Sequence, residues 1–160
     1  MEGWIRRAGA ADLSRIAEIL VFVKRLKYWP IFGDEAYSFG ELTVLSVAKK
    51  YAEPGILDHM FVYDDGIVKG LIHIEGREVV ELYVDSFFWN QGIGSELLTY
   101  AKEQHGVTYL WALEKNTDAI RFYEAHGFRL TGEKKFEEGT TEYLVRMERE
   151  AASWASCIPR

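Results

Sequence analysis

The 160-residue sequence has one cysteine, three prolines and no long run of apolar residues. Because Cys157 stands alone, an intramolecular disulfide is excluded, and we expect a reducing, cytoplasmic location. No apolar stretch approaches the roughly 18 residues that cross a bilayer, and no apolar run follows Arg6 and Arg7, so we expect neither a membrane span nor a secretory signal. An excess of positive charge is also absent. The formal net charge of −6 argues against nucleic acid as a partner.

Core-forming residues are plentiful. Apolar residues make up 48% of the chain and aromatic residues 14%. A chain of this length usually forms one domain and buries roughly 68–70% of its extended surface, so it needs no stabilising metal. We expect one domain over residues 1–148 and a C-terminal tail over 149–160. The four histidines lack the spacing of metal ligands, so no metal is expected.

The most informative stretch covers residues 79–95. Residues 79–84 have strand propensity, and their alternation places Glu81, Tyr83 and Asp85 on one face. The sequence Gln91-Gly-Ile-Gly94 follows and runs into a predicted helix over residues 93–104. A glycine-rich turn at a helix start presents unpaired backbone N–H groups at the positive end of the helix dipole. Such a turn favours an anion, most often a phosphate.

Three known phosphate-binding motifs contain a glycine-rich turn of this kind. The dinucleotide fingerprint needs a third glycine, where Leu97 stands, and the P-loop needs Gly-Lys-Ser/Thr, which is absent. The third motif, Arg/Gln-x-x-Gly-x-Gly/Ala directly after a strand, is the acetyl-CoA signature of the GNAT superfamily of N-acetyltransferases. The hexapeptide from Trp89 to Gly94 resembles it. It departs at the first position, because Trp89 stands where the family has arginine or glutamine and therefore lacks their side-chain contact to the phosphates.

A second motif strengthens the resemblance. The GNAT pattern Asn-x-x-Ala-x-x-Phe-Tyr-Glu-x-x-Gly-Phe is matched at every position by Asn116, Ala119, Phe122, Tyr123, Glu124, Gly127 and Phe128. It follows the glycine turn with one predicted helix and one predicted strand between them. The resemblance to the GNAT superfamily covers residues 4–147.

The resemblance implies a mixed α/β fold with a six- to seven-stranded mixed sheet flanked by about four helices. Its two central strands, here residues 79–84 and 107–113, would splay apart and hold acetyl-CoA. The implied coenzyme contacts are backbone groups of the glycine turn and of the preceding strand, with Asn116 and Tyr123 beside them. In full, the expected coenzyme-binding residues are Tyr83, Val84, Gln91, Gly92, Ile93, Gly94, Ser95, Asn116 and Tyr123.

The resemblance also implies direct attack of an amine on the thioester. An alkylammonium must lose a proton first, and Glu81 is the candidate general base. A lone carboxylate is a weak base, and Asp85 on the same strand face is the neighbour expected to strengthen it. Tyr123 is the candidate general acid for the leaving thiolate. A backbone N–H near Val84 would stabilise the oxyanion.

The acceptor is left open. A small amine is the favoured acceptor, and a peptide amine is the alternative acceptor. An acyl-CoA-binding module without transferase activity is the alternative function, which the departure at Trp89 keeps open. We expect a monomer or homodimer.

Several element boundaries are also predicted. Asp12 is expected to cap a first helix that ends near Lys27, ahead of Trp29-Pro30. A second helix is expected from residue 34 or 35 to about residue 51, with its inner face formed by Leu42, Leu45 and Ala48. A hairpin follows, with its turn at Asp65-Gly66.

Overall fold

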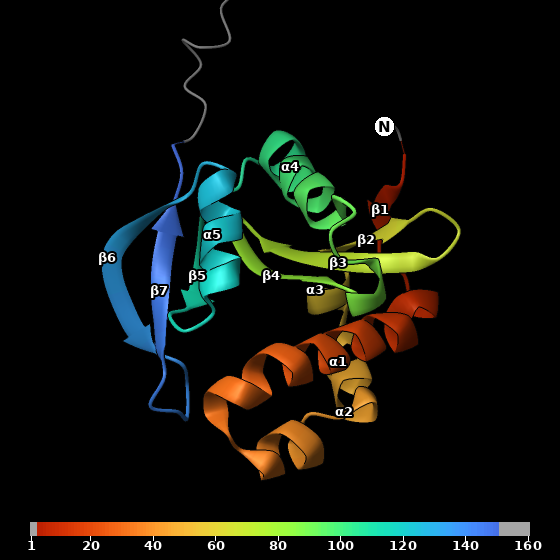
Figure 1. The fold of residues 1–160 in the computed structure, drawn as a ribbon. Helices are drawn as coiled ribbons and strands as arrows, with labels where there is room; N and C mark the ends of the chain where they lie inside the picture. Colours follow the sequence, from red (N-terminus) through yellow and green to blue (C-terminus); the bar gives the residue numbers. More distant parts are fainter. Residues whose placement is uncertain (1–2, 151–160) are drawn as a thin grey trace, which may run out of the picture. The chain divides into compact units, whose positions relative to one another are not determined.

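The computed structural model describes residues 3–150, so Cys157 and most of the expected tail lie outside the described residues. The strands are β1 (Ile5–Arg7), β2 (Met60–Asp64), β3 (Val68–Glu75), β4 (Glu78–Val84), β5 (Tyr109–Leu113), β6 (Arg129–Phe136) and β7 (Tyr143–Glu148). The α-helices are α1 (Leu13–Phe32), α2 (Val44–Tyr51), α3 (Pro54–Leu57), α4 (Ile93–His105) and α5 (Thr117–Ala125) (Figure 1). Short 3₁₀ turns lie at Ala10–Asp12 and Ser86–Phe88, and a π-helical turn lies at Ala36–Glu41.

The strands form one seven-stranded sheet in the order β1-β2-β3-β4-β5-β7-β6. The β4–β5 pair is parallel, whereas β1–β2, β2–β3, β5–β7 and β6–β7 are antiparallel. The predicted fold class, a mixed sheet flanked by helices, is therefore confirmed. Among residues 3–150, no helix combines the length and hydropathy needed to cross a bilayer. Within the same residues, no group of three His, Cys, Asp or Glu side chains could hold a metal ion.

Two compact units make up the described chain. The first contains residues 3–73 and 81–99, and the second contains residues 74–80 and 100–150. The expectation of one domain over residues 1–148 stays a prediction. In the first unit, α1 packs against α2 (Figure 1), and the apolar side chains of α1 that are most deeply buried are Ile16, Ala17, Leu20 and Val21.

The second unit contains the start of β4 and the strands that follow it. The parallel ladder between β4 and β5 joins two residue pairs, Glu78 with Tyr109 and Val79 with Leu110. Strand β5 then continues to Leu113 while pairing with β7 on its other side. The parallel ladder thus lies at the start of both strands, and the splay of the central strands stays a prediction.

The first helix is longer than predicted. It continues through Pro30 to Phe32, so the predicted end near Lys27 is wrong. Proline removes one N–H donor, but in the last turn of a helix this loss concerns a single hydrogen bond. The helix ends instead at Gly33, whose φ of +63° is left-handed and whose N–H donates to the Trp29 carbonyl oxygen (2.9 Å).

The predicted second helix is interrupted. A π-helical turn ends at Glu41, and α2 begins after Thr43, which is extended and whose hydroxyl accepts a hydrogen bond from the Ser46 N–H (3.2 Å). This new start resets the helical phase. Leu45 is consequently 73% exposed rather than buried, and Tyr51 is on the buried face.

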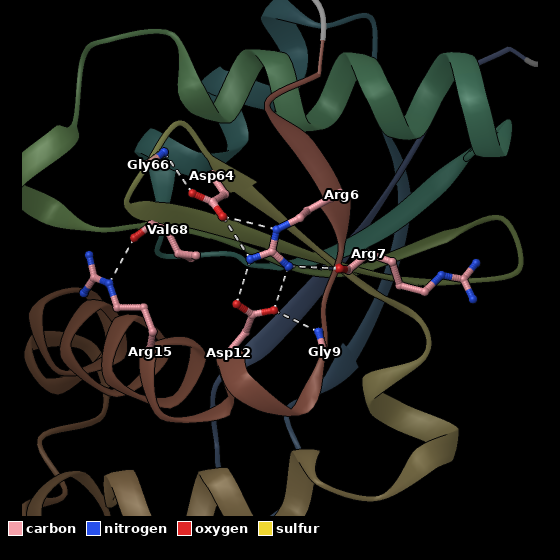
Figure 2. A network of polar contacts seen from close by, with 8 residues as sticks. All are labelled: Arg6, Arg7, Gly9, Asp12, Arg15, Asp64, Gly66 and Val68. Carbon is pink, nitrogen blue, oxygen red and sulfur yellow. Dashed lines mark hydrogen bonds and ion pairs between the residues drawn. The ribbon is translucent and has the colours of Figure 1, made fainter.

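Asp12 has a different role from the one predicted. Its carboxylate makes no cap hydrogen bond to α1. Figure 2 shows that it accepts two hydrogen bonds from the Arg6 guanidinium (2.8 and 2.9 Å) and one from the Gly9 N–H (2.8 Å), while Arg6 also donates to Asp64. The hydrogen bonds from Arg6 are the main cause that lowers the pKa of Asp12. The network ties β1 and β2 to the start of α1.

Candidate active site

The turn between β4 and α4 is open and glycine-dependent. Asn90 and Gly92 have φ values of +63° and +81°, in the left-handed region that favours glycine. The Glu96 N–H donates to the Gly92 carbonyl oxygen (3.0 Å), so the N–H groups of residues 93–95 precede the first intrahelical bond. Gly92 is exposed, and a Cβ atom built on it would meet nothing within 4 Å. Free amides at a helix start are the donors that a diphosphate requires, and diphosphate binding here stays a prediction.

Gly70 on β3 lets α4 approach the sheet. A Cβ atom at this position would lie 3.0 Å from a methyl carbon of Leu97 and 3.2 Å from one of Ile93. It would also lie 3.2 Å from the Tyr83 carbonyl oxygen of β4. The absence of a side chain at Gly70 therefore sets how closely the first turns of α4 sit against the strands.

Trp89 has a structural role at the first motif position. Its indole N–H donates to the Val84 carbonyl oxygen (2.7 Å) and so closes the turn onto the end of β4. The Lys27 ammonium of α1 lies 4.7 Å from the centre of the Trp89 ring, within the range of a cation–π interaction. Trp89 thus fixes the turn, whereas the arginine or glutamine of the motif would offer a charged or amide side chain to the phosphates.

The backbone of β4 presents alternate residues to its two edges. The Asp85 N–H donates to the Lys69 carbonyl oxygen of β3 (2.9 Å), and the Tyr83 carbonyl oxygen also lies toward β3, at Gly70. By alternation, the backbone groups of Leu82 and Val84 face the edge away from β3. Leu82 is therefore a further candidate on this edge, which the period of two along a strand could have indicated.

The Tyr83 side chain belongs to the interior of the first unit. Its hydroxyl oxygen lies 3.2 Å from that of Tyr28 on α1. Burial is the main cause that raises the pKa of Tyr83 well above its ordinary value, with the Tyr28 hydroxyl adding to it. The hydroxyl pair links α1 to β4.

Glu81 has two partners from different helices. The Tyr51 hydroxyl of α2 donates to Oε2 of Glu81 (2.6 Å), and the Lys24 ammonium nitrogen of α1 lies 3.8 Å from Oε1. Burial, and next the charge of Glu81, raises the pKa of Tyr51, so its hydroxyl remains a donor through the neutral range. Both partners fix the position of the Glu81 carboxylate.

Asp85 has partners of its own. Its carboxylate accepts a hydrogen bond from the Arg15 guanidinium (2.6 Å) and another from the Phe87 N–H (2.9 Å). The charge of Asp85 is thus balanced by α1 and by the turn that follows β4. Tyr51 and Lys24, which sequence reasoning missed, are the groups in contact with Glu81 instead.

Asn116 and Tyr123 lie in the second unit. The Asn116 side-chain oxygen accepts a hydrogen bond from the Ala119 N–H (3.3 Å) and caps α5. Tyr123 is 9% exposed, and its ring contacts those of Phe122 and Phe128, with centroids 5.2 and 5.9 Å away. Their roles toward the coenzyme stay predictions.

Comparison with known families gives a match in the middle of the chain. Residues 57–130 match the family described as "Acetyltransferase (GNAT) domain". The Escherichia coli (strain K12) protein named peptidyl-lysine N-acetyltransferase YiaC is 35% identical over 68 residues. Those residues are 42% of this chain and 47% of YiaC, so the match spans about half the length of that curated relative.

Solved structures share the fold over nearly the whole chain. Apo YjaB from Escherichia coli has a TM-score of 0.74 at 19% identity and covers 92% of this chain and 97% of its own. The PaiA N-acetyltransferase from Thermoplasma acidophilum, solved in complex with coenzyme A, has a TM-score of 0.63 at 18% identity, with 90% and 97% covered. PH1933 from Pyrococcus horikoshii OT3 has a TM-score of 0.64 at 25% identity, with 91% and 97% covered.

Residues 57–130 thus resemble a GNAT acetyltransferase domain, and the chain shares its fold with solved acetyltransferase structures.

Proposed function

We propose that the protein is an acetyl-CoA-dependent N-acetyltransferase that transfers the acetyl group to a primary amine by direct attack on the thioester. The observation that carries the proposal is one strand, β4, that leads into an exposed turn with Gly92 at φ +81° and also bears the half-buried carboxylate Glu81. The match of residues 57–130 to the GNAT acetyltransferase domain supports it, as does the coenzyme A that the PaiA structure contains.

The coenzyme's diphosphate would bind the backbone N–H groups of the turn and of the first turn of α4. These donors belong to Gln91, Gly92, Ile93, Gly94 and Ser95. The pantetheine arm would add to the edge of β4 that faces away from β3, where Leu82 and Val84 present their backbone groups. The Val84 carbonyl oxygen accepts a hydrogen bond from the Trp89 indole. The Val84 N–H would be the donor that this residue offers to the coenzyme.

Glu81 would bind the ammonium group of the acceptor and take its proton. Tyr51 holds one carboxylate oxygen at 2.6 Å, so Oε1 is the oxygen that faces the acceptor. Tyr123 would donate a proton to the leaving thiolate, and Asn116 would contact the pantetheine arm. Each residue then has one task, and each task can be removed by a conservative substitution.

The acceptor is a primary amine, and two classes are proposed. A small amine fits a carboxylate whose side chain is only 15% exposed. A lysine side chain of a peptide is the second candidate, because the relative YiaC is named as a peptidyl-lysine N-acetyltransferase. Both present the same alkylammonium group to Glu81.

A screen of small amines and lysine peptides that detects released thiol tests the proposal, with mass spectrometry of the product. We expect one acceptor class to give saturable turnover that Glu81→Gln lowers about a hundredfold or more. Coenzyme binding without turnover over the whole panel would favour the acyl-CoA-binding module. Failure to bind the coenzyme at all would overturn both functions.

A further inference from the structure

A lysine of the protein itself lies beside the proposed base. The Lys24 ammonium nitrogen is 3.8 Å from Oε1 of Glu81 and 5.9 Å from the centre of the Tyr28 ring. Its side chain is 17% exposed and that of Glu81 is 15% exposed. Lys24 is therefore an amine held in a shielded place next to a carboxylate.

The position of Lys24 coincides with the one that an acceptor must take. An amine that gives its proton to Glu81 must come within about 2.6–3.2 Å of a carboxylate oxygen. Tyr51 already occupies Oε2 at 2.6 Å, so Oε1 is the oxygen that remains, and this is the oxygen that Lys24 approaches. A small rotation about the flexible lysine side chain brings its nitrogen to hydrogen-bond distance.

We propose that Lys24 is an internal acetyl acceptor, modified in cis when acetyl-CoA is bound and no external amine occupies the site. This inference rests on the proposed function. The ammonium proton of Lys24 passes to Glu81, and the freed nitrogen forms a bond to the acetyl carbonyl carbon while the carbon–sulfur bond breaks. The sulfur keeps the electron pair of the broken bond and takes up the second proton that the nitrogen loses. The products are acetyl-lysine and coenzyme A thiol.

The modification would change the site in a defined way. An acetylated Lys24 carries no charge, so Glu81 loses its cationic neighbour and keeps Tyr51 alone. The acetamide group would stand where an acceptor binds. An external amine and Lys24 therefore compete for Oε1, and saturating acceptor is expected to suppress modification of Lys24.

The test incubates the folded wild-type protein with acetyl-CoA in the absence of amine and maps acetylated lysines by peptide mass spectrometry over time. Lys115, whose side chain is 63% exposed, reports uncatalysed acetylation in the same sample. We expect Lys24 to be modified ahead of Lys115, although it is the more buried lysine. In Glu81→Gln the rate at Lys24 should fall about a hundredfold while that at Lys115 stays the same.

A second measurement needs no variant. For a reaction in cis, the fraction of Lys24 modified per unit time is independent of protein concentration, so a tenfold dilution should leave it unchanged. Lys27, three residues further along α1, serves as the control within the same helix and should lag behind Lys24.

The outcomes separate this inference from the proposed function. If external amines are acetylated but Lys24 stays unmodified, or if Lys24 is modified equally in Glu81→Gln, the inference is wrong and the proposed function stands. If no amine is acetylated and the coenzyme does not bind, the proposed function itself has failed.

Discussion

Replacing Tyr51 by phenylalanine removes one atom from the candidate site and should have a measurable cost. The hydroxyl donates to Oε2 of Glu81 over 2.6 Å, and Tyr51 is only 4% exposed. A hydrogen bond to a charged group contributes about 1.5–3 kcal/mol. Because the Glu81 side chain keeps 15% of its surface exposed, water can replace part of the lost bond. We therefore expect Tyr51→Phe to lower the free energy of unfolding by about 2 kcal/mol at pH 7.

For a domain of this size, such a loss lowers Tm by about 4–8 °C. Thermal unfolding followed by tryptophan fluorescence would measure it. A double-mutant cycle with Glu81→Ala gives the matched control, since the phenylalanine substitution should cost far less once the carboxylate is absent. An unchanged Tm, or the same cost in both backgrounds, would refute the hydrogen bond as a source of stability.

The cost should also depend on pH. The pKa of Tyr51 is raised in the folded protein, so its contribution is complete below the ordinary tyrosine value of 10.0 and is lost as the pH rises beyond it, because the unfolded chain ionises first. The stability gap between wild type and Tyr51→Phe should narrow by about 1.4 kcal/mol between neutral pH and pH 11. A constant gap would contradict the assigned shift.

Three further substitutions test other parts of the structure. Asp12→Asn should lower the free energy of unfolding by about 1–2 kcal/mol at pH 7, because it breaks the hydrogen bonds from Arg6. Since the pKa of Asp12 is lowered, this cost should shrink as the pH falls below 3.8, and a cost that persists in acid in denaturant unfolding would contradict the role of the Arg6–Asp12 pair. Gly70→Ala should cost about 1–3 kcal/mol and weaken coenzyme binding in calorimetry, because its methyl group would lie 3.0 Å from Leu97; unchanged values of both would show that α4 shifts freely. Tyr123→Phe should lower kcat about a hundredfold with little change in KM for acetyl-CoA, and an unchanged kcat would remove Tyr123 as the acid.

The parts of the site that depend on local sequence were predictable. Gly92 lies between a strand and a helix, and its positive φ is what a phosphate-binding turn requires. Asn116 caps α5 by accepting a hydrogen bond from the Ala119 N–H. A capping side chain at a helix start is a local signal that the sequence carries. The seven-stranded mixed sheet followed from two motifs in the expected order.

The partners of Glu81 could not be predicted in the same way. Tyr51 and Lys24 come from two helices that are remote in sequence from β4, and no local pattern links them to it. The restart of α2 after Thr43 decides that Tyr51 faces the interior, and that restart was missed because the apolar spacing was extended through it. Asp85 was assigned to Glu81 from its strand face alone, whereas Arg15 of α1 takes its charge.

The most direct test of the central claim is a titration of coenzyme A into isotope-labelled protein, followed by the backbone amide signals in nuclear magnetic resonance spectra. We expect the amide signals of residues 91–95 to move in a saturable manner, together with that of Val84. Binding that leaves the amides of residues 91–95 unchanged, or no binding at millimolar coenzyme, would contradict the claim that this turn holds the diphosphate.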